Sequence, residues 1–189
     1  QDAFGVPFAG LDVVVTDPTG RRLPDAVATL FADQAPGRSQ HVRGEELTAS
    51  ASDDQGAIRF ADLQGDGEFI LRVRHPDYVD AHRAPIILTP GRYARIEVQL
   101  EDGLELTGLV TREDSGAPIQ GATVAIDDLT IVSKDFEAMR ERTAVTDADG
   151  RYRFRGLGGG KKRIYAHAEG FATASRPRFD LDPRVAAAG

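Results

Sequence analysis

The sequence predicts an all-β protein built as two antiparallel β-sandwiches in tandem. Short segments that alternate apolar and polar residues are separated by Gly, Pro and Asp along the chain, a pattern typical of strands joined by tight turns. The 189 residues also contain an internal repeat, with a period of about 90 residues. Because no long segment has the apolar spacing of a helix, these observations together favour sandwiches over mixed folds.

The repeat consists of four blocks that recur in the same order. Residues 20–30 align with 116–126, 53–63 with 147–157, 71–78 with 164–171, and 86–90 with 179–183. Apolar, glycine and aromatic positions coincide in these blocks, for example Phe60 with Phe154 and Tyr78 with Phe171. We interpret the chain as a tandem duplication of one unit.

The strands of each unit are predicted from their alternation. In the first copy the clearest segments are VATLFA (27–32), AIRF (57–60), FILRVR (69–74) and RIEVQL (95–100). One segment of the second copy, SKDFEAMRER (133–142), has the composition of a short helix in a loop, whereas its counterpart at 33–46 is a plain polar loop. Loops that differ between copies on a common scaffold are expected to carry individual function.

We expect a leader at residues 1–9, a first sandwich at 10–102 and a second at 103–189. The connection at 100–106 is only a few residues, which predicts a semi-rigid pair with a modest interface. The last strand of the first copy begins near Ala94, and its counterpart should begin near Ala187, two residues before the sequence ends. The second sandwich is therefore expected to lack its last strand in this segment, which leaves a vacant or foreign-filled edge. We expect either that the segment is cut from a longer protein, which we favour, or that another chain fills the edge by strand addition.

Composition excludes several function classes. The chain is 41% hydrophobic, which allows a real core, and its net charge of −7 argues against general nucleic-acid binding. It contains no Cys, which excludes disulfides, thiolate metal sites and a cysteine nucleophile. No apolar run reaches the roughly 18 residues of a membrane-spanning helix.

The segment TDADGRYRF (146–154) could be a turn or the start of a cation loop. A calcium loop of this kind needs Gly at its sixth position and Glu at its twelfth; counted from Asp147, these are Tyr152 and Gly158. Asp and Gly also suit a tight hairpin turn. We therefore expect a hairpin, followed by a strand with Tyr152 and Phe154 inward and its arginines outward.

The second copy resembles the carboxypeptidase regulatory-like domain over GAPIQGATVAI (116–126) and TAVTDADGRYRFRGLGGGKKRIYAHAEGF (143–171). The first copy is similar more loosely, with Asp25 at a family Gly and Ile58 at a family Tyr. The resemblance implies two seven-stranded immunoglobulin or prealbumin-like sandwiches. It also implies an accessory module of a bacterial secreted, periplasmic or cell-surface protein.

Known proteins that share this fold and carry out chemistry require residues that the chain does not supply. Intradiol dioxygenases hold iron with two Tyr and a His-x-His pair, but His167 stands alone in YAHAEG. Hydroxyisourate hydrolases end in Tyr-Arg-Gly-Ser, and Lys–Asn isopeptide adhesins need Asn, which this chain lacks. The four histidines, His41, His75, His82 and His167, are expected to be solvated or satisfied. We expect no enzymatic activity, metal or cofactor.

One candidate binding face remains. Outward positions of two strands and a turn in the second copy are basic or aromatic: Arg151, Arg153, Arg155, Lys161, Lys162, Arg163, Tyr165 and His167. If these side chains share one face, they could bind a polyanion, a carbohydrate or an acidic protein; otherwise they form a solvated strand surface. The sequence thus predicts a non-catalytic spacer or docking module whose partner is another protein or glycan. The alternative is a carbohydrate- or polyanion-binding module that uses this face or the loops at 31–47 and 127–142.

Overall fold

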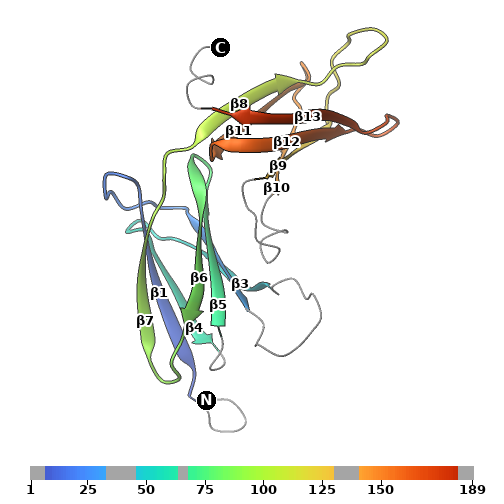
Figure 1. Cartoon of the computed structure of the whole chain (residues 1–189). Helices are drawn as coiled ribbons and strands as arrows, with labels where there is room; N and C mark the ends of the chain where they lie inside the picture. The colour runs from blue at the N-terminus through green and yellow to red at the C-terminus, as the bar shows by residue number, and fades with distance from the viewer. Residues whose placement is uncertain (1–6, 33–45, 64–67, 130–140, 183–189) are drawn as a thin grey trace. The chain divides into compact units, whose positions relative to one another are not determined.

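The computed structural model describes residues 7–32, 46–63, 68–129 and 141–182 (Figure 1). The chain divides into two compact units, Gln1–Asp102 and Gly103–Gly189. The described residues form strands and connections without a helix, so the all-β prediction is confirmed. The loop expected at 31–47 and the helix expected at 133–142 fall largely outside the described residues. The end of the latter segment, Glu141 and Arg142, begins a strand.

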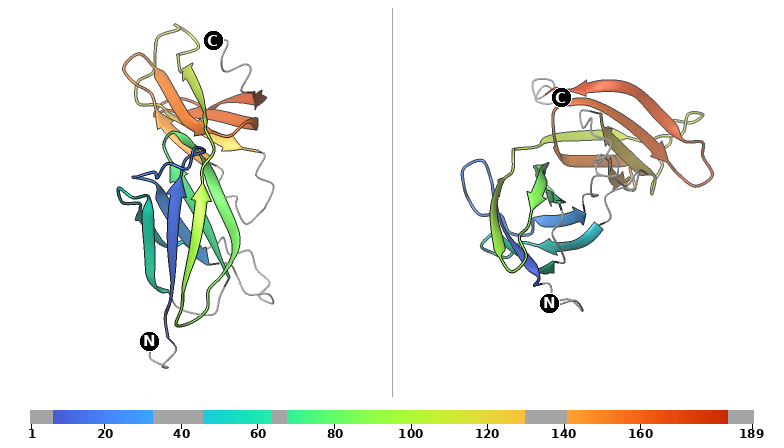
Figure 2. Two further views of the ribbon diagram at one scale, coloured as in Figure 1. Left: turned by 90° about the vertical axis from the view of Figure 1, so that its left-hand side faces the viewer. Right: turned by 60° about the horizontal axis from the view of Figure 1, so that its bottom comes forward.

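The first unit contains two sheets. Its strands are β1 (Ala9–Thr16), β2 (Val27–Ala32), β3 (Glu46–Ala51), β4 (Ala57–Leu63), β5 (Glu68–His75), β6 (Tyr78–Ile87) and β7 (Tyr93–Gln99). One sheet has the order β4-β1-β7 and the other β3-β2-β5-β6. Figure 2 shows β1 beside β7 in the smaller sheet. The two strands run parallel, from the pair Gly10 and Tyr93 to the pair Thr16 and Gln99.

The core of the first unit lies between these sheets. Alternate residues of β1, namely Leu11, Val13 and Val15, have no exposed surface. They pack against inward residues of the larger sheet such as Leu30 and Leu71, which are equally buried. Each such aliphatic side chain contributes roughly 1.5–3 kcal/mol when it is removed from water. The alternation of apolar and polar residues in the sequence therefore identifies the core-facing residues of these strands correctly.

The second unit repeats this topology. Its strands are β8 (Leu104–Leu109), β9 (Thr123–Asp128), β10 (Glu141–Val145), β11 (Arg151–Leu157), β12 (Gly160–His167) and β13 (Ala174–Leu181). The sheet orders are β11-β8 and β10-β9-β12-β13. Strands β8 to β13 thus take the places of β1 to β6, so the strand order of the first unit recurs in the second, in agreement with the repeat predicted from the sequence.

The segment after β10 is a turn, as predicted. The Oδ1 atom of Asp147 accepts hydrogen bonds from the backbone N–H groups of Asp149 (3.0 Å) and Arg151 (2.8 Å). Gly150 supplies the left-handed conformation that closes the turn, with φ of 72°. Asp147 is therefore engaged with its own backbone.

The expectation that this turn forms a hairpin is wrong. Strand β10 pairs with β9 in the larger sheet, whereas β11 pairs with β8 in the smaller one. The turn therefore carries the chain across the sandwich, from one sheet to the other. The twin turn at Asp53 does the same between β3 and β4. A local Asp-Gly pattern specifies the reversal of the chain but not the sheet that the next strand joins.

Candidate interaction surface of the second unit

The arginines of β11 point outward as predicted, because they alternate with the core residues Tyr152 and Phe154. Arg153 donates from Nη2 to Oε2 of Glu105 on the neighbouring strand β8. The backbone oxygen of Arg155 accepts a hydrogen bond of 2.6 Å from Nη1 of Arg142. This part of the predicted face is thus a strand surface on which at least one arginine is neutralised by a carboxylate.

The outward residues of β12 lie in the other sheet. Lys161, Arg163 and His167 are exposed, and Tyr165 is half-buried. Arg163 donates from Nη2 to Oδ2 of Asp127 over 2.7 Å, and the two residues face each other across the β9–β12 pair. An exposed pair of this kind contributes at most about 1 kcal/mol to stability, but it reduces the positive charge offered to a polyanion.

The expectation that β11 and β12 form one basic face is therefore wrong. The core residues Phe154 of β11 and Ile164 of β12 pack in the same cluster from opposite sheets. Outward side chains of the two strands consequently point to opposite sides of the sandwich. A ligand could contact one group or the other, and whether either group binds a ligand stays a prediction.

Lys162 does not belong to the exposed surface at all. Its side chain is 2% exposed, and it lies on the inward side of β12 with Ile164. Its Nζ atom lies 3.0 Å from Oδ2 of Asp128 and donates a hydrogen bond of 3.0 Å to the carbonyl of Gly159. Both contacts are needed to offset the loss of water around a buried ammonium. Lys162 is therefore a structural residue.

A shallow hollow of about 620 Å³ lies on the outer side of the β8–β11 sheet. Its lining includes Thr107, Arg151 and Arg153 together with two exposed apolar side chains, Leu109 and Val145. Leu109 is 55% and Val145 66% exposed. The hollow, whose lining also includes Asp147, combines charges of both signs with apolar surface, which suits contact with a protein better than the capture of a small molecule.

The clearest difference between the two units is at the β8 edge. In the first unit β1 is paired on both sides, by β4 and β7, but among the described residues β8 pairs only with β11. Three inward residues of β8 and the segment after it, Leu104, Leu106 and Val110, are only partly buried. Within the part of the chain that the structure describes, the side of β8 away from β11 therefore has no paired strand.

Tyr152 lies against the neighbouring strand β8. Its ring reaches from β11 across β8, where its hydroxyl lies over Gly108. A Cβ atom at Gly108 would be 2.2 Å from that hydroxyl oxygen, so a larger residue there would require the Tyr152 ring to shift. Partial burial raises the pKa of Tyr152 above its usual value.

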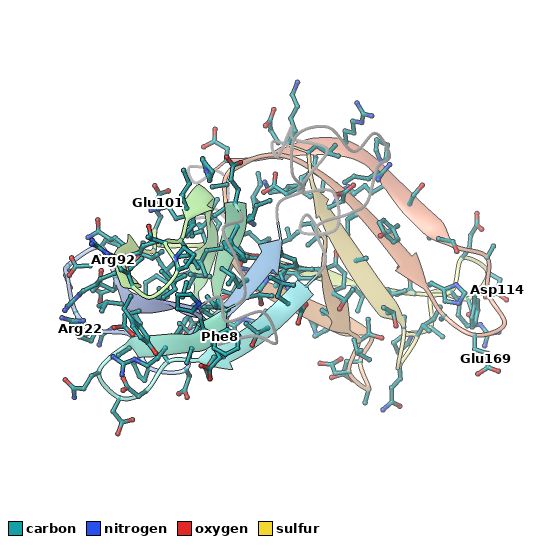
Figure 3. All side chains as sticks on the ribbon, turned by 90° about the horizontal axis from the view of Figure 1, so that it is seen from below. Phe8, Arg22, Arg92, Glu101, Asp114 and Glu169 are labelled. Atoms are coloured by element: carbon teal, nitrogen blue, oxygen red, sulfur yellow. The ribbon has the colours of Figure 1, made fainter. Side chains whose placement is uncertain are left out.

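The two loops at one end of the unit are joined by an aromatic contact. The guanidinium of Arg112 lies 5.1 Å from the centre of the Phe171 ring. Figure 3 shows the labelled side chains of Asp114 and Glu169 on these same loops.

Of the histidines, His167 Nδ1 lies 3.4 Å from the Thr173 hydroxyl. His75 Nδ1 accepts a hydrogen bond of 3.2 Å from the backbone of Asp77. His41 lies outside the described residues. Within residues 7–32, 46–63, 68–129 and 141–182, no three His, Asp or Glu side chains are grouped as metal ligands would be. In the same residues no helix is long and apolar enough to cross a membrane.

The second unit is similar to one protein family. Residues 105–188 match the model of the carboxypeptidase regulatory-like domain, as the sequence motifs predicted. For the first unit this resemblance stays a prediction, supported by the shared strand order. A search of curated protein sequences found no significant match.

Solved structures with a similar fold include bacterial pilins. A streptococcal ancillary pilin is 15% identical with a TM-score of 0.38, and the alignment covers 96% of this chain and 61% of the pilin. The shaft pilin SpaA from Lactobacillus rhamnosus GG is 12% identical with a TM-score of 0.35, covering 93% and 94%. The TIE protein of Bacillus anthracis is 16% identical with a TM-score of 0.37. This chain spans only 31% of that protein, although 93% of this chain is aligned.

Proposed function

We propose that the chain is a non-catalytic structural and interaction module, a spacer or docking domain in a bacterial secreted or cell-envelope protein. The observation that supports the proposal is the pair of exposed apolar side chains, Leu109 and Val145, that line a shallow hollow on the outer side of the β8–β11 sheet. Exposed apolar surface beside charged groups is what a docking module presents to a partner protein.

The alternative of carbohydrate or polyanion binding has weaker support. The candidate residues are divided between two sheet faces, and the charges of Arg153 and Arg163 are compensated by Glu105 and Asp127. The exposed Arg151 and Lys161 belong to different sheets, so the candidate residues do not gather on one face. Retention on a heparin column, compared between the chain and its Arg151→Glu variant, measures this alternative directly.

Gene replacement in the source bacterium tests the proposed function. The coding segment for residues 10–182 is replaced by an unrelated pair of β-sandwiches of equal length, and a control strain carries the native segment with the same epitope tag. We expect the tag to fractionate with the envelope or the culture medium and apart from cytoplasmic markers, since the module is proposed to be secreted or part of the envelope. A docking role further predicts that the replacement abolishes co-purification of envelope proteins seen with the control. A tag that fractionates with cytoplasmic markers contradicts the proposal.

A further inference from the structure

The outer face of the β4-β1-β7 sheet in the first unit carries an aromatic ring that lies flat on the strands. A Cβ atom added to Gly10 of β1 would lie 2.2, 2.4 and 2.7 Å from three consecutive atoms of the Tyr93 ring on β7. Because these distances are so similar, the ring turns its face, and not its edge, towards the backbone of Gly10. The contact uses only one face of the ring, and Tyr93 remains 59% exposed. A flat aromatic surface is thus accessible on this sheet.

A row of charged residues crosses the sheet next to this ring. Asp12 of β1 is the direct neighbour of Arg59 on β4 and of Arg95 on β7. Arg59 donates from Nε (2.7 Å) and Nη2 (3.0 Å) to the two carboxylate oxygens of Asp12, and its guanidinium carbon lies 5.3 Å from the centre of the Tyr93 ring. The hydrogen bond with Arg59 is the main cause that holds the pKa of Asp12 below its usual value. The row is therefore fixed in position and offers both donors and acceptors.

The row borders a hollow of about 580 Å³ on the same face. Its polar lining consists of planar side-chain groups that can bind hydroxyls, namely those of Asp12, Arg22, Asp53, Gln55, Arg59 and Arg95. The aliphatic lining residues Val13, Val14 and Ile58 are buried, so they offer little apolar surface to a ligand. Three guanidinium groups face two carboxylates, and the charges of the lining nearly balance. This hollow suits a neutral ligand rich in hydroxyl groups better than a polyanion or an apolar peptide.

The second unit does not repeat the arrangement. The matched pairing of β4 with β1 and of β11 with β8 places Thr107 at the position of Asp12 and Glu105 at that of Gly10. A glutamate side chain therefore projects where the ring lies flat in the first unit, and the threonine has no carboxylate to offer to Arg153. The ring and the charged row belong to the first unit and are not a general consequence of the fold.

We propose that the outer face of the β4-β1-β7 sheet is a binding site for a neutral polysaccharide. One pyranose ring stacks its C–H face on the Tyr93 ring, and its hydroxyl groups exchange hydrogen bonds with Asp12, Arg59 and Arg95. Because the Tyr93 ring rests on Gly10 and Arg59 is bonded to Asp12 before the sugar arrives, little side-chain entropy is lost on binding. The site lies in the first unit and is independent of the docking hollow of the second.

Retention by polysaccharides in native gels tests the proposal with the full chain. The gels contain dextran, amylopectin, mannan, xylan or galactan, and migration is compared with that in a gel without polysaccharide. Tyr93→Ala removes the ring and Tyr93→Phe keeps it, while Phe171→Ala removes a ring that is 38% exposed in the second unit. We expect at least one polysaccharide to retard the native chain, Tyr93→Phe and Phe171→Ala alike. For Tyr93→Ala the affinity should fall about tenfold or more.

Three further variants test the geometry of the site. Gly10→Ala adds a Cβ that displaces the Tyr93 ring and leaves every polar group in place. Asp12→Asn keeps the shape of the side chain and removes the charge that holds Arg59. We expect each to weaken retention about threefold or more. Glu97→Gln, two residues beyond Arg95 on the same face of β7, is the control and should change retention by less than about twofold.

NMR signals of the tyrosine rings locate the sugar on the native chain without any substitution. The chain contains four tyrosines, so selective ¹³C labelling gives a small set of ring signals, and the spectrum of Tyr93→Phe identifies that of Tyr93. An oligosaccharide of the retained polysaccharide should shift the Tyr93 signal. The signals of Tyr152 and Tyr165, which lie in the second unit, should stay unchanged.

Three results would overturn the inference. The first is the absence of retention by all five polysaccharides. The second is retention that Tyr93→Ala leaves unchanged, which would show that the sugar binds elsewhere. The third is a shift of the Tyr93 signal by poly-L-proline and by no sugar, which would make the face a surface for protein segments. None of these results changes the fractionation or the co-purification in the gene-replacement strains, so the two proposals fail separately.

Discussion

The buried pair of Lys162 and Asp128 gives the sharpest prediction about stability. The Lys162 side chain is 2% exposed and the Asp128 side chain 22%. Breaking a buried ion pair by removing one charge typically costs 3–5 kcal/mol, because the other charge stays desolvated. Since Asp128 retains some contact with water, we expect Asp128→Asn to lower the free energy of unfolding of the second unit by about 2–3 kcal/mol.

The complementary variant should behave differently. Lys162→Met removes the buried ammonium and fills its space with an apolar chain of similar length, and Asp128 can then be solvated. We expect a change of about 1 kcal/mol or less. Because the chain has two units, unfolding in urea is followed through NMR amide signals of β9 and β12, which report the second unit alone.

The order of the two effects is the test. If Lys162→Met is as destabilising as Asp128→Asn, the attraction within the pair stabilises the fold, and the reasoning from desolvation is refuted. An Arg163→Met variant serves as the control, because its ion pair with Asp127 involves a half-exposed guanidinium. That variant should change the free energy of unfolding by less than about 1 kcal/mol.

Three further predictions concern the turns. Hydrogen bonds, chiefly from the Thr19 hydroxyl, hold the pKa of Asp17 at about 2, below its unfolded value. The stabilisation they provide is therefore complete above about pH 4 and is lost as pH falls towards 2. In urea titrations, Asp17→Asn should flatten the dependence of the free energy of unfolding on pH in this range, and an unchanged slope contradicts the assignment. Gly150→Ala should destabilise the second unit more than Gly116→Ala in thermal melts. Both sites have positive φ, but only at Gly150 would a Cβ lie 2.6 Å from a carbonyl oxygen, that of Val110. The difference in the free energy of unfolding should be about 1 kcal/mol or more. Calcium at millimolar concentration should leave the melting temperature unchanged, since Asp147 already accepts two backbone hydrogen bonds; a rise in melting temperature would restore the cation-loop interpretation.

Much of the fold could be predicted because core-facing and solvent-facing residues alternate along each strand of a β-sandwich. The inward position of Phe154 and the outward position of Arg153 follow from that period alone. The repeat shows the same pattern a second time, so the succession of strands in one unit predicts that in the other. Neither signal states which sheet a strand joins, which is why the expectation of one basic face over β11 and β12 is wrong.

The errors at the candidate site have a common cause. The alternation that puts Arg163 outward and Ile164 inward also puts Lys162 inward. The expectation instead treats Lys162 as an exposed residue of the turn that precedes the strand. Its partner Asp128 lies on β9, and Glu105, which pairs with Arg153, lies on β8. Cross-strand partners are far away in sequence, so their positions depend on register, which a single sequence does not display.

The parallel arrangement of β1 and β7 has a mechanical consequence. Because the first and last strands of the first unit run side by side in the same direction, the polypeptide enters at one pole of the unit and leaves at the other. Tension along the chain would load the hydrogen bonds between these two strands in shear, all together, instead of opening them one after another. A unit with this connection of its terminal strands resists being pulled apart, which would suit the spacer role proposed above.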